Sequence, residues 1–233
     1  MTTAVLVLAA GMGDRLGAGR PKALVALQGR PLLEHALEVI AASGVADEVA
    51  VVFPEPARSS FESLLDELPQ AIRAAVLVRG GRTRQESVRS GLDAVAGSAD
   101  IVLCHDAARP LATPELFRRV EDGLRGVEGS IPVIPSPDTV KLIEAGKVLR
   151  TLPRAEVRLA QTPQAFLLQA LLDAHTRALR EGTEGTDDAM LLEAAGYSVA
   201  AVEGEIQNFK ITTAEDLRRA EQILAERGEG ALR

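Results

Sequence analysis

The sequence predicts an α/β fold in which a doubly wound, mostly parallel sheet carries helices on both faces and a β-hairpin arm projects from the sheet. The sheet is predicted because short apolar runs alternate with longer segments whose apolar residues recur at helical spacing. The arm is predicted because residues 135–153 interrupt this alternation with two strand-like runs around a polar turn. We expect a single domain over residues 1–233, with the arm at about 135–153.

The strands are predicted by short runs rich in Val, Ile, Leu and Ala, and are expected at 3–8, 48–53, 74–78, 100–105, 130–134, 197–202 and 209–212. The helices are predicted by apolar residues three and four positions apart, and are expected at 31–42, 61–68, 86–95, 114–124, 167–180, 186–195 and 213–225. Pro31 favours a helix start, and Gly196 a helix end. In the arm, strands 139–143 and 148–152 flank a turn at 144–147. An isolated hairpin is marginally stable, so the arm is expected to pack against another surface, or else to fold back on its own domain.

The composition is that of a soluble globular protein, with 46% hydrophobic and 25% charged residues among 233. The net charge of -7 argues against nucleic acid as a partner. The single cysteine, Cys104, excludes an internal disulfide and is interpreted as buried packing. No apolar stretch is long enough to span a bilayer, and Met1-Thr2-Thr3 lacks the charged start of a signal peptide, so we expect a cytoplasmic protein without a membrane partner.

The loop after the first strand carries glycines at 11, 13, 17 and 19 together with the cations Arg15 and Lys22. Glycines let the backbone approach a ligand closely, and two cations neutralise phosphate oxygens, so the loop favours a nucleoside triphosphate site. It is not a Walker A loop, because Pro21 precedes Lys22 and Ala23 follows it, and it is not a dinucleotide fingerprint, because Leu16 replaces the third glycine. The alternative is a flexible turn with solvated cations.

Three motifs follow three predicted strands directly. Residues 9–11 follow the first strand, residues 80–81 the third, and residues 106–109 the fourth. Ligands of open α/β sheets bind at the carboxyl ends of the strands, so these motifs are expected to converge on one cleft.

Five motifs, taken in order, resemble those of a known family. They are the loop Ala-Ala-Gly-x-Gly-x-Arg-x-Gly with its following Pro-Lys, and the segments 80–88, 105–110, 161–164 and 208–212. Together they resemble the 2-C-methyl-D-erythritol 4-phosphate cytidylyltransferases, which have a Rossmann-like nucleotidyltransferase fold. The resemblance implies that the chain joins CTP and 2-C-methyl-D-erythritol 4-phosphate to give 4-diphosphocytidyl-2-C-methyl-D-erythritol and pyrophosphate, in the non-mevalonate isoprenoid pathway.

The resemblance also implies roles for individual residues. Catalytic cations are implied at Arg15, Lys22, Arg154 and Lys210. Nucleotide binding is implied for Ala9, Ala10, Gly11, Gly13, Gly80, Gly81, Ser87, Asp106 and Ala107, with Ser87 and nearby backbone reading the cytosine edge. Binding of the polyol phosphate is implied for Asp106, Arg109, Thr139, Thr162, Thr186 and Lys210.

A cofactor and a partner are implied in the same way. Mg²⁺ is expected to be held mainly by the CTP phosphates, and no residue is assigned as its ligand. A homodimer through the arm is implied, in which Arg154 and Thr139 act in the cleft of the other subunit.

Three alternatives stay open at this point. Ribitol 5-phosphate cytidylyltransferases are closely similar but tend to have Ala-Gly-Gly where this chain has Ala9-Ala10-Gly11. Sugar 1-phosphate nucleotidyltransferases that use UTP or dTTP usually have a longer chain and a different loop. A non-catalytic nucleotide-binding regulator is expected to lose a cation such as Arg15 or Lys22, and both are present.

Overall fold

The computed structural model describes residues 1–13, 16–17, 19–69 and 75–230. Its main sheet consists of β1 (Thr3–Leu8), β4 (Glu48–Phe53), β5 (Val76–Arg79), β6 (Ile101–Asp106), β7 (Gly129–Pro135), β10 (Arg158–Ala160), β11 (Gln164–Leu167) and β12 (Val199–Glu203). Around it lie α1 (Leu32–Ser43), α2 (Arg58–Glu67), α4 (Arg84–Val95), α5 (Pro114–Asp122), α6 (Leu168–Glu181), α7 (Asp188–Ala194) and α8 (Ala214–Gly230). Two 3-10 turns, η2 (Lys22–Leu24) and η3 (Glu55–Ala57), complete the described helical segments. None of the described helices is long and apolar enough to cross a membrane.

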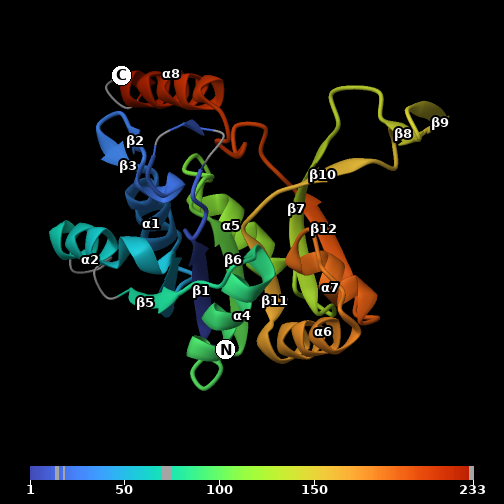
Figure 1. Cartoon of the computed structure of the whole chain (residues 1–233), viewed down its shortest axis with the longest axis horizontal. Helices are drawn as coiled ribbons and strands as arrows, with labels where there is room; N and C mark the ends of the chain where they lie inside the picture. Colours follow the sequence, from blue (N-terminus) through green and yellow to red (C-terminus); the bar gives the residue numbers. More distant parts are fainter. Residues whose placement is uncertain (14–15, 18, 70–74, 231–233) are drawn as a thin grey trace.

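The strand order of the sheet is β10-β7-β11-β6-β1-β4-β5, with β12 paired to β7 (Figure 1). β1 pairs in parallel with β4 and β6, β4 with β5, and β12 with β7. β11 runs antiparallel between β6 and β7, and β10 runs antiparallel to β7. The predicted doubly wound, mostly parallel α/β fold is therefore confirmed, with two antiparallel strands that the sequence did not predict.

The sheet has a helical layer on each face because its central strands alternate between two cores. Val5 and Val7 of β1 belong to the core under α1, α2 and α5, whereas Ala4 and Leu6 belong to the core under α4, α6 and α7. The central strands β1 and β6 are buried on both faces, which explains why these runs are continuously apolar rather than alternating. A third core, with Leu27 and others, lies beneath α8.

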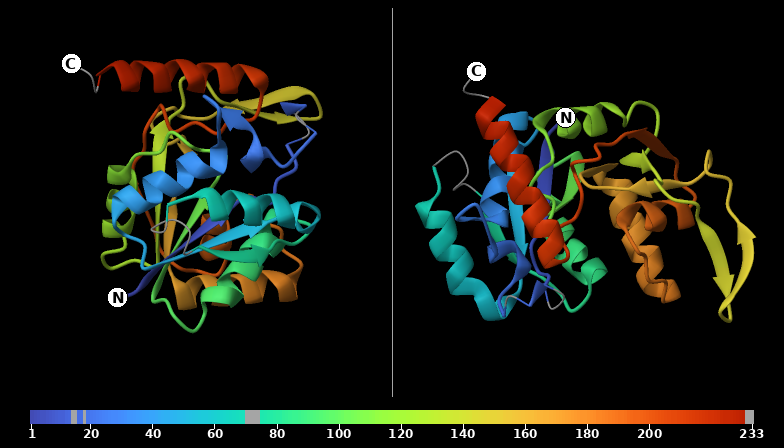
Figure 2. Two further views of the ribbon diagram at one scale, coloured as in Figure 1. Left: turned by 90° about the vertical axis from the view of Figure 1, so that its left-hand side faces the viewer. Right: turned by 90° about the horizontal axis from the view of Figure 1, so that it is seen from above.

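The predicted arm is present as a separate hairpin of β8 (Lys141–Glu144) and β9 (Lys147–Thr151). Its turn has positive φ at Ala145 (48°) and Gly146 (78°), as a tight two-residue hairpin turn requires. Every residue of both strands is exposed. Figure 1 and the right-hand view of Figure 2 show the arm extending away from the sheet, so it does not fold back on its own domain.

Several predicted boundaries need correction. Residues 209–212 form no strand, because the backbone of Ile211 donates to Ala108 O (2.8 Å) in a loop rather than to a neighbouring strand. α2 starts three residues earlier than predicted, and α8 continues to Gly230 instead of ending at Ala225. The short hairpin of β2 (Ala26–Leu27) and β3 (Arg30–Pro31) was also missed. Residue 74, predicted to start a strand, lies outside the described residues.

Replacing Gly91 by Val is expected to destabilise the protein by about 1–3 kcal/mol, the usual cost of overpacking a core. Gly91 lies where α4 meets the sheet, and a Cβ there would be 2.9 Å from Leu6 Cδ1 and 3.1 Å from Val52 Cγ2. Urea unfolding measures the change. The matched control is Gly97→Val, because a Cβ at Gly97 has open space around it. Equal stability of the two variants would contradict the tight packing at Gly91.

Candidate functional site

The carboxyl ends of β1 and β6 open into a cavity of about 400 Å³, which we call the first cavity. Its wall includes the loop after β1, the turn after β5, and the first residues after β6. The predicted site residues that line it are Ala9, Ala10, Gly11, Lys22, Gly81, Ser87, Asp106, Ala107 and Lys210. The three motifs expected at the strand ends therefore meet, as the topology of a parallel sheet requires.

Two of the predicted glycines, Gly13 and Gly80, do not line the cavity but pack against residues that do. Gly80 donates its N–H to Phe53 O (2.8 Å), and a Cβ there would be 2.9 Å from Ala10 Cβ and 3.0 Å from Ser87 Oγ. Gly13 has a φ of +74°, and a Cβ there would be 3.0 Å from the Cβ of Lys22. Neither residue lines the cavity, but each allows lining residues to approach one another closely.

The loop after β1 is folded back onto Lys22, whose backbone N–H donates to Gly11 O (3.0 Å). This bond holds the start of η2 against the small-residue loop, and the side chain of Lys22 lines the first cavity. Arg15, the second predicted cation of this loop, lies outside the described residues.

The hydroxyl of Ser87 organises the turn after β5. It donates to Thr83 O (2.9 Å) and accepts from the N–H of Gly81 (3.1 Å). Thr83 in turn caps α4 by accepting from the N–H of Glu86 (3.0 Å). Ser87 is buried at the cavity wall, so its oxygen and the backbone of Gly81 are held in a fixed arrangement there.

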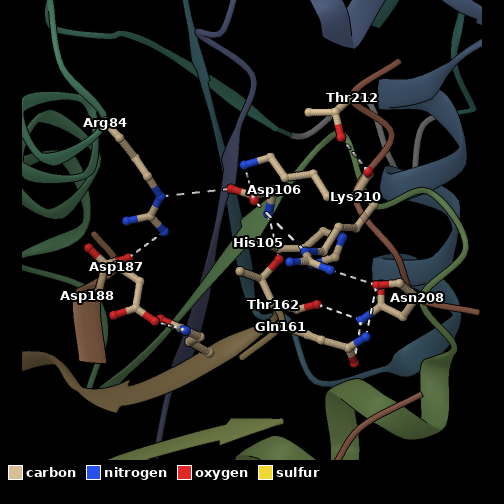
Figure 3. A network of polar contacts seen from close by, with 12 residues as sticks. Arg84, His105, Asp106, Gln161, Thr162, Asp187, Asp188, Asn208, Lys210 and Thr212 are labelled. Carbon is tan, nitrogen blue, oxygen red and sulfur yellow. Dashed lines mark hydrogen bonds and ion pairs between the residues drawn. The ribbon is translucent and has the colours of Figure 1, made fainter. Parts of the chain in front are cut away.

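Asp106, the last residue of β6, is surrounded by cations (Figure 3). Lys210 Nζ lies 2.7 Å from Oδ2, while Nε of Arg84 and Nε of Arg109 each lie 3.9 Å from a carboxylate oxygen. Burial raises the pKa of the Asp106 carboxyl, but the charges of Lys210, Arg84 and Arg109 outweigh burial and lower this pKa to about 2. The carboxylate is therefore ionised at neutral pH.

A second cavity of about 210 Å³ adjoins the first, and Arg84, Asp106 and Lys210 line both. The residues predicted to bind the polyol phosphate that line the second cavity are Asp106, Arg109, Thr162, Thr186 and Lys210. Thr162 Oγ1 accepts from the backbone N–H of Asp106 (3.0 Å), which fixes the segment before β11 against the end of β6.

A hydrogen-bonded framework holds the segment that carries Lys210. Arg109 Nη1 donates to Asn208 O (2.7 Å), and Asn208 Nδ2 donates to Thr162 O (2.9 Å). Gln161 Nε2 also donates to Asn208 O (3.2 Å). Figure 3 shows this framework beside Asp106 and Lys210, so the side chains that line the second cavity have fixed supports.

His105 and Cys104 are buried in β6 and belong to the core. Burial lowers the pKa of the His105 imidazole to about 4, so the ring is neutral at pH 7. Burial raises the pKa of the Cys104 thiol, which keeps it protonated and unreactive. The interpretation of Cys104 as buried packing is confirmed.

The predicted arm residues lie elsewhere. Thr139 and Arg154 are exposed and line neither cavity of this chain, and Arg154 Nε donates to Ser136 O (3.2 Å). Conversely, the polar residues of the second cavity to which the sequence assigned no role are Arg84, Gln161, Gln164 and Asp187. Arg84 carried a signal, because it is a cation three residues after the strand-end glycine Gly81.

Comparison with known proteins gives one consistent result. Residues 3–226 match the family model described as "IspD: 2-C-methyl-D-erythritol 4-phosphate cytidylyltransferase". A curated protein of that name from Halalkalibacterium halodurans is 41% identical, and the match covers 97% of this chain and 99% of the relative. The crystal structure of 4-diphosphocytidyl-2C-methyl-D-erythritol synthase from Anaerococcus prevotii superposes with a TM-score of 0.85 at 31% identity, covering 96% of this chain and 98% of that one.

Other relatives are longer. The "Bifunctional enzyme IspD/IspF" of Nitrobacter hamburgensis is 43% identical over 96% of this chain, but the match covers 55% of that protein. The chain thus spans about half the length of the bifunctional relatives that it matches.

The Asp106 carboxylate is expected to lower the free energy of unfolding of the protein as the pH falls below about 4. Because its pKa is lowered to about 2 from 3.8, its stabilising contribution is complete above about pH 4 and is lost as the pH falls through 2. The free energy of unfolding of the wild type, relative to Asp106→Asn, is expected to fall by roughly 2 kcal/mol over that range. Urea unfolding of both proteins from pH 6 downward measures it. Parallel pH curves for the two proteins would show that the cations do not hold this carboxylate ionised.

Proposed function

The chain belongs to the 2-C-methyl-D-erythritol 4-phosphate cytidylyltransferase family, and from this premise we propose that it transfers the cytidylyl group of CTP to 2-C-methyl-D-erythritol 4-phosphate and releases pyrophosphate. The observation that carries the proposal is that two adjoining cavities share Arg84, Asp106 and Lys210. One cavity has the small-residue loop and Lys22 suited to a triphosphate, and the other has threonine hydroxyls and Arg109 suited to a phosphorylated polyol. Two substrates would meet at the shared residues.

The proposed reaction is an attack of a phosphomonoester oxygen on the α-phosphorus of CTP. A phosphomonoester has a second pKa near ~6, so it is largely dianionic at neutral pH and requires no general base. The barrier is electrostatic, because two anions must approach and charge develops on the leaving pyrophosphate. Lys22 at the first cavity and Lys210 at the junction supply fixed positive charge for this purpose, and Arg15 is proposed to add to it.

Lys210 has a particular place in this proposal. Its ammonium lies 2.7 Å from Asp106 Oδ2, and both residues line the two cavities. An incoming phosphate dianion competes for that ammonium, and the released carboxylate of Asp106 can accept from a hydroxyl of the ribose or the polyol. The ion pair therefore keeps both groups in position before the substrates arrive.

Selection of the nucleotide is proposed to rest on the fixed turn after β5. The Gly81 N–H donates to Ser87 Oγ and the Ser87 hydroxyl donates to Thr83 O, so this turn offers a ligand at the wall of the 400 Å³ cavity acceptor groups, the Ser87 oxygen among them. A base edge read by such groups must fit between them and the loop of Ala9, Ala10 and Gly11, which favours a pyrimidine over the larger purines.

Mg²⁺ is proposed to be held mainly by the phosphates of CTP. Among the described residues there is no group of three or more His, Cys, Asp or Glu side chains that could hold a metal ion, and Asp106 at the first cavity is already surrounded by cations. This donor set fits a metal carried by the nucleotide rather than by a protein cage. When bound, the ion neutralises charge on the triphosphate.

The ribitol 5-phosphate alternative is not favoured, because the matching family model and the Halalkalibacterium halodurans relative are both named for methylerythritol phosphate. A non-catalytic regulator is not favoured either, because Lys22 and Lys210 are both retained at the first cavity.

The proposed activity is tested by incubating the protein with labelled CTP, Mg²⁺ and a panel of acceptors, and by measuring pyrophosphate release. Methylerythritol 4-phosphate is expected to be used, whereas ribitol 5-phosphate and sugar 1-phosphates are expected to be poor acceptors. UTP and dTTP in place of CTP are the controls for the base. Preferential use of ribitol 5-phosphate would overturn the assignment of the acceptor.

We further propose that the chain forms a homodimer through the arm and acts in the cytoplasm without a nucleic-acid or membrane partner. The support is physical: the arm exposes Leu142, Ile143, Val148 and Leu149, with exposed fractions from 40% to 61%. Apolar side chains on a marginally stable hairpin favour burial against a second surface. In such a dimer, Arg154 and Thr139 would serve the cleft of the other subunit.

A shared cleft predicts complementation between inactive variants. Lys22→Ala and Arg154→Ala are each expected to be inactive, and a mixed dimer would contain one cleft with both changes and one with neither. Random subunit exchange makes roughly half of the dimers mixed, so about a quarter of wild-type turnover is expected to return. Turnover after mixing measures this, with subunit exchange confirmed by labelled chains. If exchange occurs and no activity returns, Arg154 acts within its own chain or not at all.

A further inference from the structure

Arg84, the first residue of α4, occupies an unusual place in the site. Its side chain lines both cavities and is 28% exposed. Figure 3 shows its guanidinium between two carboxylates that come from distant parts of the chain. Nη2 lies 2.8 Å from Asp188 Oδ2, and Nε lies 3.9 Å from Asp106 Oδ1.

Asp188 holds Arg84 from the buried side. Its side chain is 1% exposed, and its second oxygen lies 3.3 Å from Nε2 of the equally buried His175 on α6. A carboxylate enclosed in this way has little freedom to move. Because it binds one guanidinium nitrogen at hydrogen-bond distance, it fixes the direction in which Arg84 extends toward the cavities.

The contact between Arg84 and Asp106 is different. At 3.9 Å it is too long for a hydrogen bond, and the Asp106 carboxylate is already paired with Lys210 at 2.7 Å. Among the described residues, the two cavities are lined by five cations, Lys22, Arg82, Arg84, Arg109 and Lys210, and by two carboxylates, Asp106 and Asp187. The buried Asp188 adds a third carboxylate behind Arg84, so the surplus charge of the lining is still positive, which favours a bound anion.

We infer that Arg84 is a further substrate-contacting cation of the site, which donates to a phosphoryl oxygen of the bound nucleotide, and that Asp188 is its positioning residue. This inference rests on the proposed function. Asp188 occupies Nη2, so the remaining donors of the planar guanidinium are oriented toward the cavities that its side chain lines. His175 supports Asp188 from behind.

A purely structural role would be to attach α4 to the segment before α7. That attachment is already made by the neighbouring Gln85, whose Nε2 donates to Thr183 O (3.2 Å) and whose Oε1 accepts from the N–H of Gly185 (3.0 Å). Gln85 lines neither cavity. Gln85 therefore binds the segment before α7 to α4, while the neighbouring Arg84 places its positive charge at the cavities.

The test uses Arg84→Gln, Asp188→Asn and the double variant, with melting temperature, turnover and CTP affinity measured for each. Each single variant is expected to lose stability, because it leaves one buried charge without its partner. The double variant removes both charges and is expected to regain most of the melting temperature. Its kcat/KM is nevertheless expected to stay at least about tenfold below wild type, and its CTP affinity, measured by calorimetry, at least about fivefold lower.

Two further variants complete the design. Arg84→Lys keeps the charge and is expected to recover part of the turnover that Arg84→Gln loses. Arg89→Gln is the matched control: Arg89 lies five residues further along α4 and donates to Thr176 Oγ1 on α6 (3.0 Å), but it lines neither cavity. It is expected to leave turnover and CTP affinity within about twofold of wild type.

The outcomes separate this inference from the proposed function. A double variant with wild-type turnover and CTP affinity overturns the role of Arg84. Such a result would mean that Arg84 and Asp188 only stabilise the fold, so that activity returns once stability returns. A wild type that binds CTP but transfers it to no acceptor overturns the proposed function, and Arg84 is then judged by CTP affinity alone. A wild type that does not bind CTP overturns both.

Discussion

The ion pair between Asp106 and Lys210 is the interaction on which the site depends. Asp106 ends the central strand β6, and its carboxylate attracts cations that arrive on three separate segments, at Arg84, Arg109 and Lys210. Burying a charge costs free energy unless an opposite charge lies close to it. The buried carboxylate of Asp106 therefore depends on the nearby cations. Removing Asp106 would leave Arg84, Arg109 and Lys210 without the carboxylate that they share.

The antiparallel strand β11 makes this arrangement possible. By entering between β6 and β7, it brings Thr162 against the end of β6, where the hydroxyl accepts from the backbone of Asp106. The carbonyl of Thr162 then receives Asn208, and the segment of Lys210 is fastened further by the bond from Ile211 to Ala108 O. A departure from the parallel pattern thus supplies the second wall of the cleft.

Much of this was predictable because local signals were strong. The buried strands β1, β4 and β6 are continuous apolar runs, and glycines in the sequence indicate the loop after β1 and the turn at 80–81. β10 and β11 were missed because strands of three and four residues owe their pairing to partners far along the chain. Arg84 was missed for the same reason, since Asp188, which gives it a direction, lies 104 residues away.

The wall common to the two cavities has a thermodynamic consequence. Arg84, Asp106 and Lys210 belong to both, so an anion in one cavity alters the electrostatic potential experienced by a ligand in the other. Linkage requires that such an effect be mutual: whatever one ligand does to the affinity of the second, the second does equally to the first. On the proposed function, the two cavities are therefore a coupled pair of sites, and the occupancy of each depends on the concentration of both substrates.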